Sequence, residues 1–313
     1  MSINILTQNR RVGDHMSIES RSWETDMVGS HGVIDHYGTT SLLRRVDEAL
    51  RHAGLGDGRI EWAELAPLDQ FHVRSLAATR ELAEALGIDS GANLLDVGCG
   101  LGGPARFLAA TYGCYVTGID LSEPFVEAAR MLTERSGLAD KVSFLQADAL
   151  DLPFADEFFD HAWTQHVAMN IADRAGFYAA IHRVLKPGGR LAIYDVVAGE
   201  GSPPTYPVPW ARVPGISFLV TPEAMRNGLA RAGFKELSWD DKTVACRAWA
   251  DEVGAKRHSS PAPFGIHTVM GPEFAEMAGN LERNLREGRI RIVQTIVAKL
   301  RAAANRRRNE DHG

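Results

Sequence analysis

The chain has 313 residues, of which 45% are hydrophobic, and a formal net charge of −6 at pH 7. This length allows one large domain with additions or two small ones, and the acidic balance argues against a nucleic-acid-binding surface over the whole molecule. Three cysteines form neither a disulfide framework nor a metal-ligand motif, so we expect a protein of a reducing compartment.

The first 64 residues are expected to form an extension with one cap helix. Residues 1–30 are polar and lack the apolar core of a signal peptide, and no stretch of the sequence is apolar for long enough to span a membrane. We therefore expect a cytoplasmic protein. Ser41 is a suitable N-cap for a helix that ends at Gly54.

A further helix is predicted before the first strand, because five residues repeat at helical spacing: Leu76, Thr79, Leu82, Ala83 and Leu86. A group of polar and aromatic side chains lies near its start: Asp69, Gln70, Phe71, His72 and Arg74. His72 is either a solvated or capping histidine or a residue that contacts a bound ligand.

The stretch from Asn93 to Asp120 predicts a strand, a glycine turn, a helix, a second strand and a terminal acid, which is typical of a nucleotide-binding βαβ unit. The turn contains four glycines: Gly98, Gly100, Gly102 and Gly103. Larger side chains there would keep a ligand away from the backbone and from the first N–H groups of the helix. Asp120 is placed to accept hydrogen bonds from both hydroxyls of a ribose.

The glycine spacing alone also fits the G-x-G-x-x-G pattern of dinucleotide-binding enzymes. Three other features oppose a dinucleotide. Asp96 lies just before the glycines, where it would repel a pyrophosphate and attract the ammonium group of an amino acid. Asp148 follows a predicted third strand over 142–146 and can take the amino group of adenine. Residues 182–196 (HRVLKPGGRLAIYDV) predict a helix end, a Pro-Gly-Gly turn and a strand.

In these features, residues 79–197 resemble the class I S-adenosylmethionine-dependent methyltransferases. The resemblance implies S-adenosylmethionine as cofactor and S-adenosylhomocysteine as product. It implies an α/β fold with a seven-stranded Rossmann-like sheet, mostly parallel with the last strand antiparallel, helices on both faces, an N-terminal helical cap and a lid after the fifth strand. The residues expected to bind the cofactor are Asp96, Gly98, Cys99, Gly100, Gly102, Asp120, Leu121, Asp148, Ala149 and Gln165. Cys99 is expected there as a small residue that fits the turn.

The rest of the chain continues this pattern. Strands are expected over 160–163, 190–197, 234–240 and 290–297, the last one rich in β-branched residues and inserted antiparallel. Helices are expected over 124–136, 173–185, 222–232, 242–258 and 272–287. The predicted domains are an extension and cap helix over 1–64, a methyltransferase domain over 65–300 with a lid (199–221) and a late helical insertion (242–288), and a basic flexible tail over 301–313.

Methyl transfer from a sulfonium needs proximity and alignment more than a metal or a covalent nucleophile, and the sequence offers no evident metal site. The acceptor atom needs a lone pair, so a base helps when that atom carries a proton. His166 follows the fourth strand and is the predicted base, with packing or a cofactor contact as its alternative role. Gln165 beside it and Asn170 can hold a polar acceptor through paired donors and acceptors.

The proline- and glycine-rich residues 199–220 are expected to cover the acceptor. Tyr206 and Trp210 can enclose a methylammonium group by cation–π contact, or can simply pack the lid. Arg212 can pair with a substrate carboxylate or lie on the surface. With His72 and Asn170, these residues form the predicted acceptor site.

Within the superfamily, the chain looks like small-molecule N-methyltransferases of the sarcosine and dimethylglycine type and their quinone and tocopherol C-methylating relatives. The supporting residues are 96–103, Trp163–His166 (WTQH), Lys186–Gly189, the long lid and the late helices. By that resemblance, His166 stands where glycine-betaine-forming members carry an acid, and Asn170 stands where several relatives carry a histidine.

Three functions remain open. The first is N-methylation of a glycine-derived amine, which would require Arg212, Arg74 or Arg44 to point inward toward the carboxylate of that amine. The second is C- or O-methylation of a phenolic, quinone or isoprenoid compound, which suits an aromatic lid of Tyr206, Trp210 and Phe218 without an inward arginine. The third is cofactor binding without methyl transfer, as in a cyclase or a regulatory binder. The expected partner is a small molecule and not a nucleic acid, and we also consider a homodimer.

Overall fold

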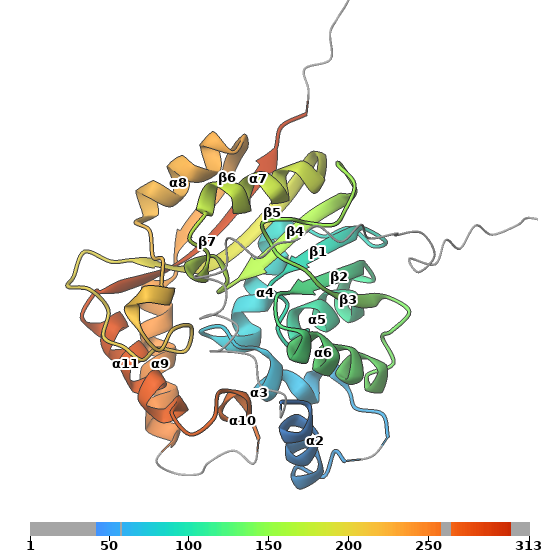
Figure 1. Ribbon diagram of the computed structural model, residues 1–313, viewed down its shortest axis with the longest axis vertical. Helices are drawn as coiled ribbons and strands as arrows, with labels where there is room; N and C mark the ends of the chain where they lie inside the picture. The colour runs from blue at the N-terminus through green and yellow to red at the C-terminus, as the bar shows by residue number, and fades with distance from the viewer. Residues whose placement is uncertain (1–41, 57, 258–263, 302–313) are drawn as a thin grey trace, which may run out of the picture.

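The computed structural model describes residues 42–56, 58–257 and 264–301 (Figure 1). Within these ranges one sheet contains β1 Asn93–Val97, β2 Tyr115–Asp120, β3 Val142–Gln146, β4 Phe159–Gln165, β5 Leu185–Ala198, β6 Phe234–Asp241 and β7 Ile290–Lys299. The strand order is β3-β2-β1-β4-β5-β7-β6, and β7 runs antiparallel to both of its neighbours. The predicted seven-stranded fold with an antiparallel last strand is confirmed.

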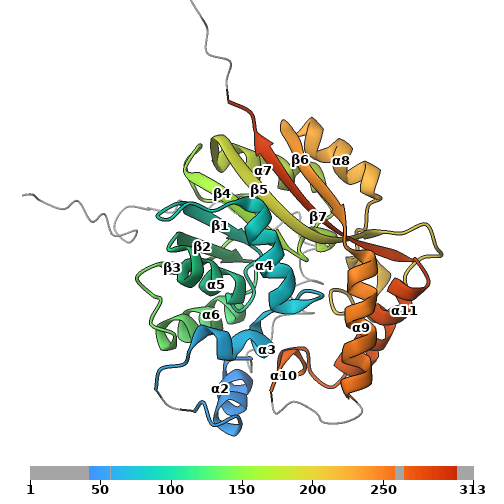
Figure 2. The same ribbon diagram turned by 180° about the vertical axis from the view of Figure 1, so that it is seen from behind.

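Helices cover both faces of this sheet. The first face carries α4 Ser75–Leu86, α5 Gly103–Tyr112, α6 Glu123–Arg135 and α9 Thr243–Arg257, and the second carries α7 Arg174–Val184 and α8 Pro222–Arg231 (Figures 1 and 2). The buried apolar side chains accordingly form one cluster with Leu82 and Phe107 and another with Phe177 and Leu229. Such two-sided burial explains why β1 is buried at every position after Asn93.

β5 begins earlier than the sequence predicts. Leu185 already pairs with Phe159, residues 186–189 then leave the ladder, and Arg190 rejoins it opposite His161. As a result α7 ends at Val184, before the Pro-Gly-Gly segment that was expected to stop it.

The helix predicted from the apolar residues between Leu76 and Leu86 is confirmed as α4. A short 3₁₀ turn η1 (Trp62–Leu65) and α3 (Ala66–Asp69) end at Gln70, and α4 begins only at Ser75. Arg74 and Ser75 have φ angles of 70° and 48°, which no right-handed helix accommodates. The interruption brings Phe71 against the glycine turn, since a Cβ atom on Gly100 would lie 3.2 Å from the Phe71 ring.

The late helices reach back to the N-terminal part of the chain. α11 (Phe274–Arg286) packs on α9, and the short α10 (Ile266–Met270), which the sequence did not predict, packs on α3 and on the cap helix α2 (Leu42–His52) (Figure 1). Ser41, the predicted N-cap, lies outside the described residues, as do 1–40 and the tail from 302 onward. The predicted domain boundaries therefore remain predictions.

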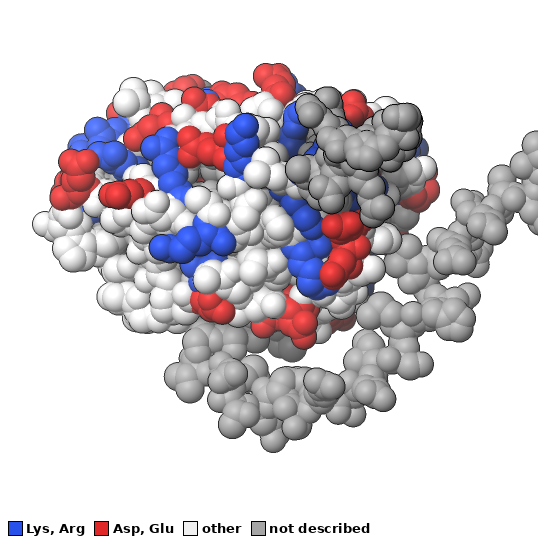
Figure 3. Space-filling view, turned by 90° about the horizontal axis from the view of Figure 1, so that it is seen from above, with Lys and Arg blue, Asp and Glu red and all other residues white. Residues whose placement is uncertain are grey.

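The described part of the chain contains no helix long and apolar enough to cross a membrane. On the face that Figure 3 shows, acidic and basic side chains of the described residues are interspersed rather than gathered by sign. A continuous basic surface of the kind that binds nucleic acid does not form on that face.

Candidate active site

The turn between β1 and α5 needs glycine for both conformation and space. Gly98, Gly100 and Gly102 have φ angles of 73°, 54° and 78°, which strain residues with a Cβ atom. A Cβ on Gly98 would overlap the side chain of Val167, and one on Gly102 would overlap Phe144. Glycine at these positions therefore lets the turn fold tightly against the neighbouring side chains at the carboxyl end of β1.

Asp120 ends β2 beside this turn. Its Oδ2 accepts the N–H of Gly100 at 2.9 Å, and its Oδ1 accepts the N–H of Ser122 at 3.0 Å. Burial raises the pKa of this carboxyl, while these backbone hydrogen bonds oppose the rise. The carboxylate is thus held in place by backbone donors and keeps lone pairs for ribose hydroxyls.

Asp96 on β1 is 2% exposed, and its Oδ2 has no hydrogen-bond partner. Burial, and then the charge of Asp120, raises the pKa of Asp96 to about 8. A buried acceptor without a partner costs stability, and a cation beside it would remove that cost. Asp96 therefore fits the ammonium group of the methionine part of S-adenosylmethionine.

The remaining predicted cofactor residues lie around the same strand ends. Asp148 is exposed and accepts the N–H of Leu150 at 2.9 Å, and the carbonyl of Leu121 accepts a hydrogen bond from Gln146 at 3.1 Å. Ala149 is half-buried. Cys99 is buried, and that burial raises the pKa of its thiol, which disfavours the reactive thiolate and agrees with a packing role.

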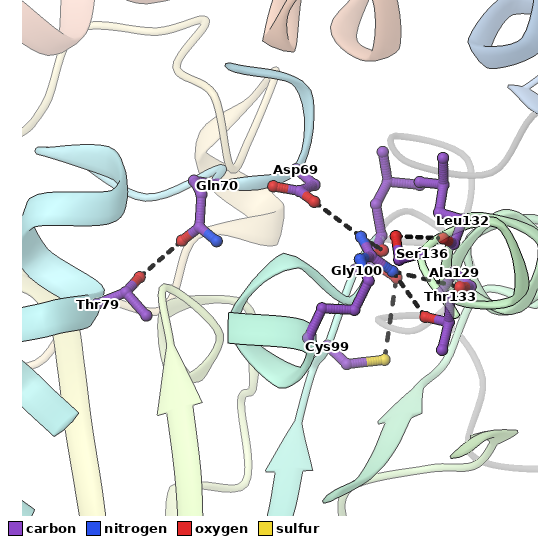
Figure 4. A network of polar contacts seen from close by, with 11 residues as sticks. Asp69, Gln70, Thr79, Cys99, Gly100, Ala129, Leu132, Thr133 and Ser136 are labelled. Carbon is purple, nitrogen blue, oxygen red and sulfur yellow. Dashed lines mark hydrogen bonds and ion pairs between the residues drawn. The ribbon is translucent and has the colours of Figure 1, made fainter. Parts of the chain in front are cut away.

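Asp69 ties the segment before α4 to the glycine turn (Figure 4). Its Oδ2 accepts a hydrogen bond from Arg106 Nη2 at 2.7 Å, and the same nitrogen donates to the carbonyl of Leu101 at 2.7 Å. The other terminal nitrogen of Arg106 donates to Thr133 Oγ1 on α6 at 2.9 Å. The Arg106 side chain is fully buried. One guanidinium therefore joins α3, the glycine turn and α6.

Gln165 at the end of β4 is held by its oxygen. Oε1 accepts a hydrogen bond from Trp163 Nε1 at 3.0 Å and lies 3.4 Å from Thr79 Oγ1. Because this oxygen is fixed, the amide nitrogen Nε2 has a set direction, and it is buried without a partner. Gln165 can therefore donate a hydrogen bond to a bound ligand, as predicted for its place between cofactor and acceptor.

His166 follows β4 with a φ angle of 54°, a costly backbone conformation of the kind that clusters at functional sites. Its backbone N–H donates to the carbonyl of Tyr194 at 2.8 Å, and its ring stacks on the Tyr194 ring with centroids 5.4 Å apart. Its Nε2 is buried without a partner. Burial, and then the neighbouring His72, holds the pKa of His166 well below its usual range, so the ring is neutral near pH 7.

His72 is a buried neighbour of His166 and not a solvated histidine. It is 3% exposed, and its ring meets those of His166 and Tyr194 edge-on, at centroid distances of 6.2 and 6.0 Å. Its Nε2 lies 2.8 Å from the carbonyl of Ser75, so that nitrogen carries the proton. Burial lowers the pKa of His72 to about 4, and this ring is also neutral.

Two predicted acceptor residues instead hold the lid. Asn170 Nδ2 donates to the carbonyls of Trp210 at 2.7 Å and Ile216 at 3.0 Å, which uses both of its amide protons within the protein. Trp210 is 2% exposed, and its Nε1 donates to Ser217 Oγ at 2.9 Å. Tyr206 is partly buried and packs against the same apolar cluster as Trp210. The structure therefore favours the packing role for this part of the lid.

The three arginines considered for a substrate carboxylate have carboxylate partners of their own. Arg212 is exposed and donates to Glu273 at 2.8 Å. Arg74 forms a two-pronged pair with Glu81, with its Nη1 at 2.7 Å from Oε2. Arg44 is 76% exposed and lies 3.7 Å from Glu48. Arg74 is close enough to Tyr194 for its charge to act on that hydroxyl, and the Tyr194 ring stacks on His166.

Neither Arg106 nor Tyr194 was identified from the sequence as part of this region. The part that Thr79 plays in the hydrogen-bond network was not identified either. A charged residue within the otherwise apolar stretch of α5 was the available signal for Arg106, since buried arginines need partners. Tyr194 and Thr79 carried no such signal, because each fits an apolar pattern by spacing alone. Thr79 nonetheless takes part in the network, because its Oγ1 donates a hydrogen bond to Gln70 Oε1 at 2.6 Å.

A surface hollow of about 680 Å³ opens elsewhere, near the turn between β6 and α9, and charged residues including Asp241, Arg247 and Arg291 line it. Arg291 is paired with Glu200 at 2.6 Å. None of the predicted site residues lines this hollow. Among the residues in the described ranges, no group of three or more His, Cys, Asp or Glu side chains is arranged to hold a metal ion.

Comparison with known proteins agrees with the geometry. A family model described as a methyltransferase domain matches residues 95–193. Methyltransferase GfsG of Streptomyces halstedii is 40% identical over 136 residues, or 44% of this chain and 49% of that protein, so the chain spans about half of that relative. O-methyltransferase rstn1 of Aspergillus nomiae is 35% identical over 206 residues, or 64% of this chain and 88% of that protein.

Among solved structures, the [4+2]-cyclase SpnF aligns with 26% identity and a TM-score of 0.61, over 85% of this chain and 95% of that one. This alignment covers more of the chain than the family model does. With its tight glycine turn, the neighbouring acids Asp96 and Asp120, and a 35% identical methyltransferase matched over 88% of its length, the chain belongs to the class I S-adenosylmethionine-dependent methyltransferases.

Proposed function

We propose that this chain transfers a methyl group from S-adenosylmethionine to an oxygen atom of a largely apolar small molecule. The observation that carries the proposal is the neutral ring of His166, fixed by Tyr194 at the end of β4, with Nε2 buried and unpartnered. A neutral imidazole in this position is able to accept the proton of a hydroxyl group.

The charges around the lid support an oxygen acceptor over a carboxylated amine. Such an amine needs a cationic partner for its carboxylate, and the three arginines considered for that role are paired with Glu273, Glu81 and Glu48. Lid residues Val208 and Trp210 are buried in an apolar cluster. The name of rstn1, an O-methyltransferase, points the same way.

When bound, S-adenosylmethionine supplies a methyl group that its sulfonium already activates. His166 Nε2 would take the proton of an acceptor hydroxyl beside it, which would leave the oxygen a lone pair for the methyl group. Asp96 holds the ammonium group and Asp120 the ribose, so the reacting atoms are aligned by the strand ends of one sheet. Gln165 Nε2 donates a hydrogen bond at the boundary between cofactor and acceptor.

A transfer assay with methyl-labelled S-adenosylmethionine tests the proposal. It compares catechol and 2,3-dihydroxynaphthalene with sarcosine and dimethylglycine, using the unchanged chain, His166→Gln and the control His182→Gln. His182 is a half-buried histidine of α7 that packs edge-on against Phe234, 5.0 Å away. We expect label in the phenols, and a loss of about a hundredfold or more in turnover for His166→Gln alone.

Label in the amines alone would overturn the oxygen acceptor. Equal turnover by His166→Gln and the unchanged chain would remove the base. Cofactor binding without transfer to any of the four compounds would favour a protein that binds S-adenosylmethionine without methylating, which is the alternative suggested by the likeness to a cyclase.

A further inference from the structure

We infer that Asn284 is a positioning residue that fixes the lid as a rigid wall of the acceptor site and so sets which acceptors fit. The inference rests on the proposed function, because it concerns the acceptor side of the same site. It assigns acceptor selectivity to α11, a helix that contributes no residue to the cofactor side.

Asn284 is fully buried on α11 and binds both backbone groups of one lid residue. Its Oδ1 accepts the N–H of Thr205 at 2.8 Å, and its Nδ2 donates to the carbonyl of Thr205 at 2.9 Å. This is the pair of hydrogen bonds that a neighbouring antiparallel strand would supply. The two residues are 79 positions apart, so the contact fixes the register of the lid against a distant helix.

Asn280 extends the same contact by one helical turn. Residues four apart lie on the same side of a helix, and Asn280 Nδ2 donates to the carbonyl of Pro207 at 2.9 Å. Val208 and Ala211 then exchange hydrogen bonds of 2.8 and 3.0 Å, which closes a tight turn around Trp210. The first half of the lid is therefore tied to α11 at Thr205 and Pro207 and lies beside that helix (Figure 1).

The second half of the lid is fastened to the segment after His166. The N–H of Phe218 donates to the carbonyl of Met169 at 2.7 Å, and Arg174 Nη2 donates to the carbonyl of Phe218 at 3.0 Å. Asn170 adds its two bonds to Trp210 and Ile216. The lid is thus stretched between α11 and the proposed base, and a shift at either end moves the wall that faces the acceptor.

The hydrogen bonds of Asn284 explain why a side chain that only packs could not replace it. Leucine has the same branched arrangement of four side-chain heavy atoms as asparagine, but its methyl groups cannot hydrogen-bond and would leave the partly buried N–H and C=O of Thr205 without these partners. The lid would then release these groups to water or find another register. The side-chain amide of Asn284 is therefore needed to hold the lid and not to pack α11.

The test compares Asn284→Leu, which loses both bonds, with Asn280→Leu, which loses one, and with Asn227→Leu, an exposed position on α8. For each variant kcat and KM are measured for catechol and for 2,3-dihydroxynaphthalene, with cofactor affinity by calorimetry and amide hydrogen exchange over residues 205–219. We expect Asn284→Leu to raise acceptor KM about tenfold, to change the preference between the two probes and to speed exchange across the lid, with cofactor affinity unchanged. Asn280→Leu should show the same changes to a smaller extent, and Asn227→Leu none.

An unchanged probe preference in Asn284→Leu, with only a lower thermal stability, would overturn the inference and leave Asn284 a structural residue. Unchanged exchange over 205–219 would overturn it as well. If the unchanged chain methylates neither probe, the oxygen acceptor fails, while hydrogen exchange still decides whether Asn284 holds the lid. If Asn284→Leu does not fold, the milder Asn280→Leu decides by the same readouts.

Discussion

The cofactor side and the acceptor side of the site are built in different ways. On the cofactor side, Asp120 binds backbone groups of the turn that it faces, and the turn and both acids belong to one βαβ unit. On the acceptor side, the lid contacts Asn284 and Asn170 across 79 and 40 positions of the chain. The comparison teaches that cofactor binding is a local property of the sequence, whereas acceptor choice depends on long-range contacts that can change without disturbing the cofactor.

The largest expected effect tests whether the cofactor side also depends on a contact between residues far apart in the sequence, Asp69 and Arg106. Arg106→Met leaves Asp69 as a buried carboxylate without its partner, so we expect a loss of about 3–5 kcal/mol in the free energy of unfolding. Denaturant titration measures it. The double variant Asp69→Leu/Arg106→Met should recover most of the loss, because no unpaired charge remains. A double variant no more stable than Arg106→Met would contradict this account.

Asp120→Ala should break the cofactor side alone. The variant loses the ribose acceptor and the two hydrogen bonds that shape the turn, and we expect cofactor affinity to fall about a hundredfold by calorimetry. Asp140→Ala, at an exposed position, is the control. Hydrogen exchange over 205–219 should stay unchanged, and a loosened lid would show that the two sides are not separate.

Asp96→Asn should weaken cofactor affinity about tenfold while stabilising the cofactor-free protein. The pKa of Asp96 is raised in the folded protein, to about 8 from an ordinary 3.8, so the folded state keeps a proton that the unfolded chain releases. The unchanged protein therefore loses stability as pH rises through this window, and the asparagine variant does not. Thermal unfolding should show a difference between the two proteins that grows as pH rises from 3.8 toward about 8. A difference that shrinks with rising pH would reverse the assignment.

The dependence of kcat on pH should be weak, and this tests His166 as the base. A histidine with its usual pKa would lose about two thirds of its neutral form between pH 7 and pH 6. The pKa of His166 lies well below that range, so kcat should change by less than about 1.5-fold over the same interval and fall only at lower pH. A threefold loss by pH 6 would mean that the base is another group or a more exposed one.

Arg212→Ala should have the smallest effect. The exposed pair with Glu273 contributes about 0.5 kcal/mol or less to stability, and acceptor KM should stay within about twofold. A large rise in KM for a carboxylated acceptor would instead show that Arg212 turns inward when that acceptor binds. That result would return an amine to consideration.

The sequence predicted where the glycine turn and its acids lie in the fold, because this motif has a physical reason at each position. It placed Gly98, Asp96 and Asp120 at the strand ends where the structure has them. It gave no sign of the positive φ angles of Arg74 and Ser75, because the spacing of apolar residues does not report backbone angles. It also could not find the partner of Asn284, because a side chain that binds the backbone of Thr205 leaves no signal in the identity of Thr205.

The position of β7 has a consequence for how this protein is made. β7 is the last strand along the described chain, yet it lies between β5 and β6 and pairs with both. During synthesis the whole cofactor motif leaves the ribosome while the long apolar edge of β5 still has no neighbour. Until residue 299 is available, that edge is open to pairing with other chains. A chain shortened before β7 would therefore keep every cofactor-binding residue and still be prone to aggregate, so the yield of folded protein is decided by its last strand.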